Sequence, residues 1–100
     1  MPRKAVDNRV LTGLREATVI EALARLSDHW KVDASYRPLK SARSIRVHLT
    51  AGGREYELVC TGAKWWDTRA HRGGGGAIDL AMHLYQCSFK RALELLEGER

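Results

Sequence analysis

A pair of alternating segments separated by two glycines constrains the fold more than any other feature of the chain. Apolar and polar residues alternate over 45–50 and again over 54–60, as they do in strands with one buried face. Gly52 and Gly53 lie between these segments, and glycine readily adopts the positive φ of a two-residue hairpin turn. A hairpin closed there pairs apolar residues on one face: Leu49 with Tyr56, Val47 with Leu58, and Ile45 with Cys60.

The outer face of this hairpin carries polar side chains. The same register places His48 opposite Glu57, and this cross-strand pair accounts for the histidine without any ligand. It places Arg46 opposite Val59, so the arginine has no charged partner across the strand. We therefore predict that Arg46 is available to an anionic ligand.

Helical patterns lie on both sides of the strands. Thr18 and Glu21 have capping-box spacing, and the apolar residues that follow predict a helix from Thr18 to about His29. A second apolar stripe predicts a helix from Gly76 to about Gln86. Ser88 is the predicted N-cap of a last helix, whose buried stripe consists of Phe89, Ala92, Leu93 and Leu96.

One small domain over residues 1–100 accommodates these elements, with residues 1–5 as a disordered arm. The predicted class is α+β. An N-terminal helix precedes an antiparallel sheet of three or four strands, and two C-terminal helices pack on one face of that sheet. No apolar run is long enough to span a bilayer and no signal peptide is visible, so we expect a cytoplasmic protein without membrane contact.

The net charge of +5 is unevenly distributed. Residues 31–75 carry nine basic and four acidic side chains, whereas the rest of the chain is balanced. This excess favours a polyanionic partner, most simply nucleic acid. Catalysis is not expected, because no serine–histidine–carboxylate set and no acidic cluster is recognisable. Cys60 and Cys87 form no CxxC pair and the four histidines are scattered, so we predict no metal and no cofactor.

The stretch Lys64-Trp65-Trp66 predicts a third strand. Adjacent strand residues face opposite sides, so one tryptophan enters the core and the other stands on the open face, and the sequence does not say which. Four glycines, Gly73–Gly76, then lead directly into a helix and offer backbone amides to an anion. They lack the GK[ST] ending of a Walker loop and the surroundings of a dinucleotide fingerprint. A flexible connector without a ligand is the alternative interpretation.

These features predict a site for single-stranded nucleic acid and do not by themselves distinguish DNA from RNA. An exposed tryptophan stacks an unpaired base, and cationic side chains take the phosphates. Residues 31–44 form either an edge strand with a loop or a mobile basic loop, and in the functional interpretation they track the phosphate backbone. The predicted nucleic-acid-binding residues are Tyr36, Lys40, Arg43, Arg46, Lys64, Trp65, Trp66, Arg69, His71, Arg72, Gly73, Gly74, Gly75 and Gly76.

The segment from Lys64 to Gly98 resembles the C-terminal half of the zinc-ribbon domain of bacterial and mobile-element DNA primases. The resemblance rests on an aromatic pair, a glycine pair, an aliphatic–Asp–aliphatic helix start and a Ser-Phe-x-x-Ala-x-x-Leu helix. These are Trp65-Trp66, Gly75-Gly76, Ile78-Asp79-Leu80, and Ser88-Phe89 with Ala92 and Leu95 or Leu96. The family's usual ligands, one histidine and three cysteines in bracketing pairs, are not matched. The chain is more similar to zinc-less relatives in plasmid and conjugative-element proteins.

This resemblance implies a zinc-ribbon-like fold without zinc and contact with single-stranded DNA. It also implies a role in the replication or transfer of a plasmid or other mobile element, in association with a primase. The alternative function is a protein-interaction adaptor that docks a primase, helicase or relaxase without touching DNA. Leu80, Leu84 and Leu95 lie off the main helical stripes and are the candidate docking residues for that adaptor.

Overall fold

The computed structural model describes residues 9, 13, 17–38 and 43–97. In these residues five strands form one antiparallel sheet packed against three helices, so the class is α+β, as predicted. The elements are α2 (Val19–Leu26), β1 (His29–Val32), β2 (Ile45–Ala51), β3 (Arg54–Thr61), β4 (Lys64–Asp67), β5 (Arg72–Gly75), α3 (Ala77–Tyr85) and α4 (Phe89–Leu96). The arm predicted at residues 1–5 lies outside the described residues.

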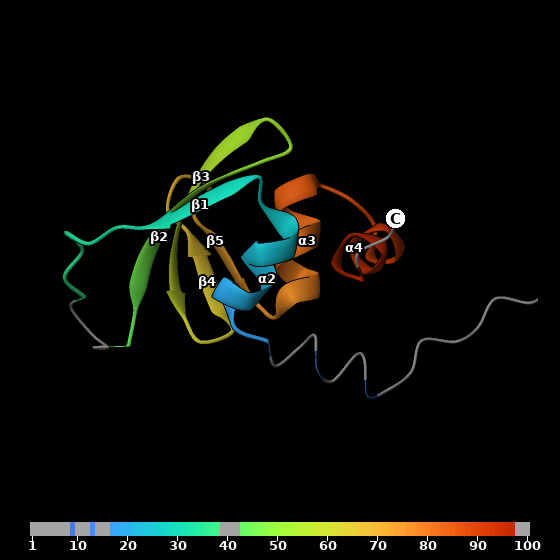
Figure 1. The fold of residues 1–100 in the computed structure, drawn as a ribbon, viewed down its shortest axis with the longest axis horizontal. Coiled ribbons are helices and arrows are strands. Elements are labelled where there is room, and N and C mark those ends of the chain that lie inside the picture. Colours follow the sequence, from blue (N-terminus) through green and yellow to red (C-terminus); the bar gives the residue numbers. More distant parts are fainter. Residues whose placement is uncertain (1–8, 10–12, 14–16, 39–42, 98–100) are drawn as a thin grey trace, which may run out of the picture.

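The sheet is a meander in which each strand pairs with the next along the chain. The helices gather on one side of it, with α4 packed on α3 (Figure 1). Among the described residues no helix or strand covers the opposite side, which we call the open face (Figure 1). The sheet has five strands where we predicted three or four. β1 overlaps the start of the edge strand left open for residues 31–44, and the additional strand is β5, which contains three of the four glycines.

The β2–β3 hairpin has the predicted register, with Leu49 opposite Tyr56, Val47 opposite Leu58 and Ile45 opposite Cys60. Gly52 and Gly53 adopt φ values of 58° and 80°, as the predicted turn requires. Four of the six paired apolar side chains are buried, and Ile45 and Tyr56 are half-buried against the same core. The alternation and the turn together therefore determine which face of the sheet is buried.

Helix α2 begins as predicted. The Thr18 hydroxyl accepts a hydrogen bond from the Glu21 amide at 3.2 Å, and the Glu21 carboxylate accepts one from the Thr18 amide at 2.9 Å. This capping box satisfies amide groups that have no partner inside the helix. The position of the helix start is thus set locally by two side chains.

The end of α2 was predicted wrongly, because the helix ends at Leu26 and not at His29. Ser27 is already extended, and the Asp28 amide donates to the Thr50 carbonyl at 2.8 Å. His29 is therefore the first residue of β1 and not the last residue of a helix. The edge of β2 offers hydrogen bonds that compete with further helical turns, and no local pattern in the sequence announces that edge.

Helix α3 has the predicted boundaries to within one residue, and Ser88 is the N-cap of α4, as predicted. Leu80 and Leu84, which we predicted off the buried stripe, are 0% and 2% exposed. Helix α3 contacts α2, α4 and β5, so it buries more of its circumference than a one-sided stripe allows. Phe89 was predicted in the buried stripe of α4 but is 44% exposed.

Candidate nucleic-acid interface

Side chains of neighbouring strands line up in rows across the open face. One row, which we call the Trp66 row, consists of Asp33, Arg46, Val59, Trp66 and Gly73. Adjacent strands lie about 4.8 Å apart, so the backbones at Arg46 and Trp66 are separated by about 10 Å. The row therefore places a cation and an aromatic ring on the same uncovered surface, within reach of one bound strand.

The two adjacent tryptophans of β4 have opposite environments. Trp65 is 5% exposed and belongs to the core, whereas Trp66 is 44% exposed on the open face. The prediction that one enters the core and the other does not is confirmed. The structure adds that Trp66 is the exposed one, so Trp65 is not available to stack a base on the open face.

The glycines of β5 give both tryptophans room. A Cβ at Gly73 would lie 2.7 Å from Cε3 of Trp66, so this indole packs over the backbone of β5. A Cβ at Gly74 would lie 2.9 Å from Cζ2 of Trp65 and would overlap the Asp79 carboxylate. A Cβ at Gly75 would meet nothing within 4 Å. Two glycines are thus required sterically, and one of them forms the platform beneath the exposed ring.

The glycine run is not the open loop that we predicted. Gly73–Gly75 pair with β4 as an edge strand, and Gly76 precedes α3 with a φ of 87°. The Gly76 amide donates to the Ala63 carbonyl at 2.9 Å, and the Gly75 amide donates to the Asp79 carboxylate at 3.1 Å. The carboxylate of Asp79 thus occupies the place where a phosphate was expected.

The Gly73 amide has a different position. The alternation of an antiparallel ladder directs the N–H groups of Gly73 and Gly75 away from β4, toward the free edge of the sheet. Since Asp79 accepts from Gly75, the Gly73 amide is the member of the run that remains for an outside acceptor. The predicted phosphate-binding role of the glycines is therefore reduced to this one position.

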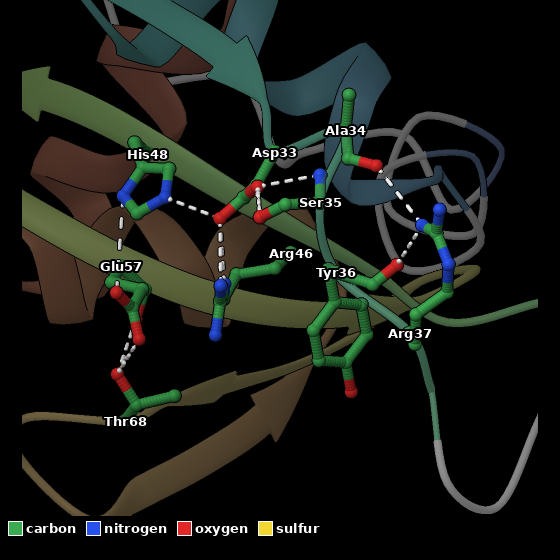
Figure 2. Close-up of polar contacts among 9 residues, drawn as sticks. All are labelled: Asp33, Ala34, Ser35, Tyr36, Arg37, Arg46, His48, Glu57 and Thr68. Carbon is green, nitrogen blue, oxygen red and sulfur yellow. Dashed lines mark hydrogen bonds and ion pairs between the residues drawn. The ribbon is translucent and has the colours of Figure 1, made fainter.

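Asp33, at one end of the Trp66 row, contacts the side chains of Ser35, Arg46 and His48 (Figure 2). Its Oδ2 accepts from Nε and Nη2 of Arg46 at 2.9 and 2.8 Å and lies 3.0 Å from Nε2 of His48. Its Oδ1 accepts from the Ser35 hydroxyl at 2.6 Å. Hydrogen bonds from Ser35, His48 and Arg46 hold the pKa of Asp33 far below its usual range, so the cluster contains a permanent negative charge.

Arg46 is therefore not the unpartnered cation that we predicted. Its hydrogen bond to Asp33 raises its pKa, and its guanidinium lies 5.1 Å from the centre of the Tyr36 ring (Figure 2). The predicted pairing of His48 with Glu57 is confirmed, at 3.8 Å. Tyr36 is half-buried, so its ring is held in place beside the cation. The arginine's partner, Asp33, follows directly after β1, in a segment for which the sequence left an edge strand and a mobile loop open.

The predicted cluster of Arg69 and Arg72 is divided between two surfaces. Arg69 lines a shallow pocket of about 240 Å³ together with Lys31 and His48 of the open face. Arg72 lines a pocket on the helical side of β5. The turn between β4 and β5 separates the two guanidinium groups, and linear proximity in the sequence concealed this.

The other predicted cations lie around the same sheet. Lys64 is exposed and shares the face of Trp66, because it precedes Trp66 by two residues in β4. Arg43 is exposed, and a Cβ at Gly62 would lie 3.6 Å from its Nη2. His71 is exposed with a φ of 56°, and its amide donates to the Asp67 carbonyl at 2.9 Å. Lys40 lies outside the described residues.

The open face is mixed in charge. Lys31, Arg46 and Lys64 share it with Asp33, Glu55 and Glu57. The excess of basic residues over 31–75 is therefore found at the ends of the face, at Arg43 and in the β4–β5 turn, more than at its centre. An anionic strand would meet its cations on either side of the Trp66 row.

A buried pair that we did not predict joins β4 to α3. Nε2 of His83 lies 2.7 Å from Oδ2 of Asp67, and both side chains are almost fully buried. Burial raises the pKa of Asp67, but hydrogen bonds from His83 and the amides of Ala70 and Arg69 outweigh it, and the pKa falls below its usual value. The His83 ring also stacks on Trp65, with 4.6 Å between ring centres.

Sequence motifs could not have identified this pair, because its two members are sixteen positions apart and a strand lies between them. The only local indication in the sequence is the carboxylate of Asp67 at the end of a predicted strand. In the structure this carboxylate also accepts hydrogen bonds from the Arg69 and Ala70 amides, each at 3.0 Å. The pair fixes the β4–β5 turn against α3. It therefore supports the edge on which Trp66 and Gly73 lie.

In the described ranges no three histidine, cysteine or acidic side chains converge as metal ligands. Burial raises the pKa of the Cys60 thiol to about 12, which makes it a poor nucleophile. No helix within the described part of the chain is long and apolar enough to cross a membrane. Comparison with protein-family models, curated proteins and solved structures finds no match to the chain.

Proposed function

We propose that the open face binds single-stranded DNA without catalysing a reaction. One observation carries this proposal: the Trp66 ring is exposed on an uncovered sheet face, seated over Gly73 and in one row with Arg46. Stacking of a base on an aromatic ring contributes about 1–3 kcal/mol and requires a base that is not already stacked in a duplex. The proposed ligand is therefore a single strand.

Cations on both sides of Trp66 take the phosphates. Lys64 lies on the same face about 6.6 Å along β4, and Arg69 follows the strand at its other end. Arg46 and His48 already contact Asp33, so they contribute less than free cations would. Because three acidic side chains share the face, we expect modest affinity with a clear dependence on salt.

The resemblance to primase zinc-ribbon domains supplies the biological setting of the proposal. In that setting the domain acts in the cytoplasm, in the replication or transfer of a plasmid or other mobile element. A primase, helicase or relaxase would be its protein partner. The adaptor function is not favoured, because Leu80 and Leu84, two of its three candidate docking residues, are buried in the core.

Fluorescence anisotropy with labelled oligonucleotides tests the proposal. Trp66→Ala should weaken binding of a single strand about tenfold or more. Phe89→Ala is the matched control, because Phe89 is equally exposed, at 44%, but lies on α4. Lys64→Ala should reduce the slope of log K against log salt concentration by about 0.7. Equal affinity for a duplex of the same sequence, or equal losses in both aromatic variants, would contradict the proposal.

A further inference from the structure

A second cavity lies on the helical side of β5. It has a volume of about 380 Å³, and its lining comes from β4, β5, α3 and the two residues after α3. The lining residues are Trp65, Arg72, Gly73, Asp79, Met82, His83, Gln86 and Cys87. We call this the β5–α3 pocket. Gly73 belongs both to its wall and to the platform beneath Trp66.

One buried donor in this pocket has no partner. Nε1 of Trp65 is buried and makes no hydrogen bond with any described residue. Cζ2, on the same edge of the indole as Nε1, lies against Gly74 and next to the Asp79 carboxylate, which also lines the pocket. A buried unpaired donor costs about 1–3 kcal/mol, so this N–H marks a place where an acceptor is missing.

His83 presents a second unused atom. Its Nε2 is taken by Asp67 at 2.7 Å, and the ring makes no other hydrogen bond within the described ranges. Nδ1 is therefore without a partner among the described residues, and His83 lines the pocket. The pocket is thus lined by an indole, an imidazole and the carboxylate of Asp79.

Arg72 adds a cation to the lining. Its side chain is exposed, and its guanidinium makes no hydrogen bond or ion pair with any residue that the structure describes. This distinguishes it from Arg46, whose guanidinium is held by Asp33. An unpaired guanidinium on the wall of a pocket that contains aromatic rings and hydrogen-bonding atoms fits a ligand with one planar and one anionic part.

We infer that the β5–α3 pocket binds one nucleotide, with its phosphate on Arg72 and its base in the cavity. Since the Asp79 carboxylate is an acceptor, a base with an exocyclic amino group fits better than thymine. Gly73–Gly75 carry no side chains, so a strand stacked on Trp66 can pass around this edge and place its next base in the pocket. The inference rests on the proposed function only for the source of the nucleotide, which is either a bound strand or free in solution.

The test uses the full chain with Trp30→Phe and Trp66→Phe, which leaves Trp65 as the only tryptophan, and its emission is excited selectively over that of the three tyrosines. Deoxycytidine monophosphate should change Trp65 emission in a saturable way and more tightly than thymidine monophosphate. Arg72→Ala should weaken this binding about tenfold, as expected for a lost charge-assisted hydrogen bond. Arg91→Ala on α4 is the matched control and should have no effect. Circular dichroism verifies that each variant is folded.

Three results would overturn the inference: no Trp65 response up to millimolar nucleotide, an equal response to inorganic phosphate alone, or an unchanged affinity in Arg72→Ala. A titration with oligodeoxycytidine determines whether the nucleotide in the pocket belongs to a bound strand or is free in solution. A Trp65 response to the oligomer assigns the pocket to the strand. Oligomer binding without that response assigns it to free nucleotides. The open-face proposal fails separately, if Trp66→Ala binds the oligomer as tightly as the unaltered chain.

Discussion

The two faces of β4 differ in what holds them together. On the closed face, Trp65 packs among helices and stacks on His83, whose partner Asp67 is on the same strand. On the open face, Trp66 packs over the β5 backbone on one side and has Val59 of β3 opposite it on the other. The comparison assigns stability to the closed face of this short strand and, under the proposed function, ligand binding to its open face. The closed face should respond to mutation in the free energy of unfolding, and the open face in binding.

The largest expected difference is between the two tryptophans. Trp65→Ala removes a buried ring and should lower the free energy of unfolding by about 3–5 kcal/mol. Trp66→Ala should lower it by less than about 1 kcal/mol, because much of that ring is already in water. Urea denaturation followed by far-ultraviolet circular dichroism measures both. Similar losses in the two variants would show that the faces are not energetically distinct.

The Asp67–His83 pair should give the closed face a pH dependence. The pKa of Asp67 is lower in the folded chain than its ordinary value of 3.8. Its stabilising contribution is therefore present above that value and is lost as the pH falls through the folded pKa. Asp67→Asn should lower the free energy of unfolding by about 3 kcal/mol at neutral pH.

The difference between Asp67→Asn and the unaltered chain should shrink in acid, since the native carboxylate is then protonated as well. Denaturation curves recorded at several pH values test this. Asp79→Asn is the control for removing a carboxylate charge. The Asp79 carboxylate also accepts a hydrogen bond, from an amide of β5, but Asp79 is exposed. A difference that stays constant from neutral pH to acid would refute the assigned role of the charge.

Two neighbouring glycines sharpen the comparison within β5. Gly74→Ala should destabilise the chain by about 1–3 kcal/mol, because the added Cβ meets Trp65 and Asp79 on the closed face. Gly75→Ala adds a Cβ with nothing within 4 Å and should change stability by less than about 0.5 kcal/mol. Thermal unfolding of the two variants measures this. Equal melting temperatures would mean that β5 shifts to accommodate the methyl group.

The hairpin could be predicted from the sequence because its determinants are local. Alternation, two glycines and the pairing rule are sufficient to fix the register at Val47 and Leu58. The capping box at Thr18 could be predicted for the same reason. The site was predicted in part, since the exposed tryptophan was expected on the open face and found there as Trp66.

The remaining features depend on contacts between distant segments. Strand β1 forms because the edge of β2 recruits Asp28 and the residues after it. Arg46, which we predicted to lack a charged partner, forms an ion pair with Asp33. The pairing of β1 with β2 brings Asp33 next to it. The glycine run looks like a flexible loop until Trp65 and Trp66 are placed over it. In each case the outcome depends on a contact with a residue that is distant in the sequence, and local patterns do not identify that residue.

The smallest expected effect concerns Asp33, and it tests whether the acidic residues limit binding on the open face. Asp33→Asn removes a negative charge and releases the Arg46 guanidinium. An exposed ion pair is worth about 0.2–1 kcal/mol, so single-stranded DNA should bind up to about fivefold more tightly. Glu94→Gln is the matched control. It also removes one charge and releases Arg91, at 3.1 Å, but on α4.

Anisotropy titrations at two salt concentrations measure both variants. If the open face is the interface, only Asp33→Asn should gain affinity, and its salt slope should steepen as Arg46 begins to contact phosphate. Equal gains in Asp33→Asn and Glu94→Gln would instead mean that net charge alone governs binding. The strand would then have no preferred face, and the division between the two sides of β4 would concern stability only.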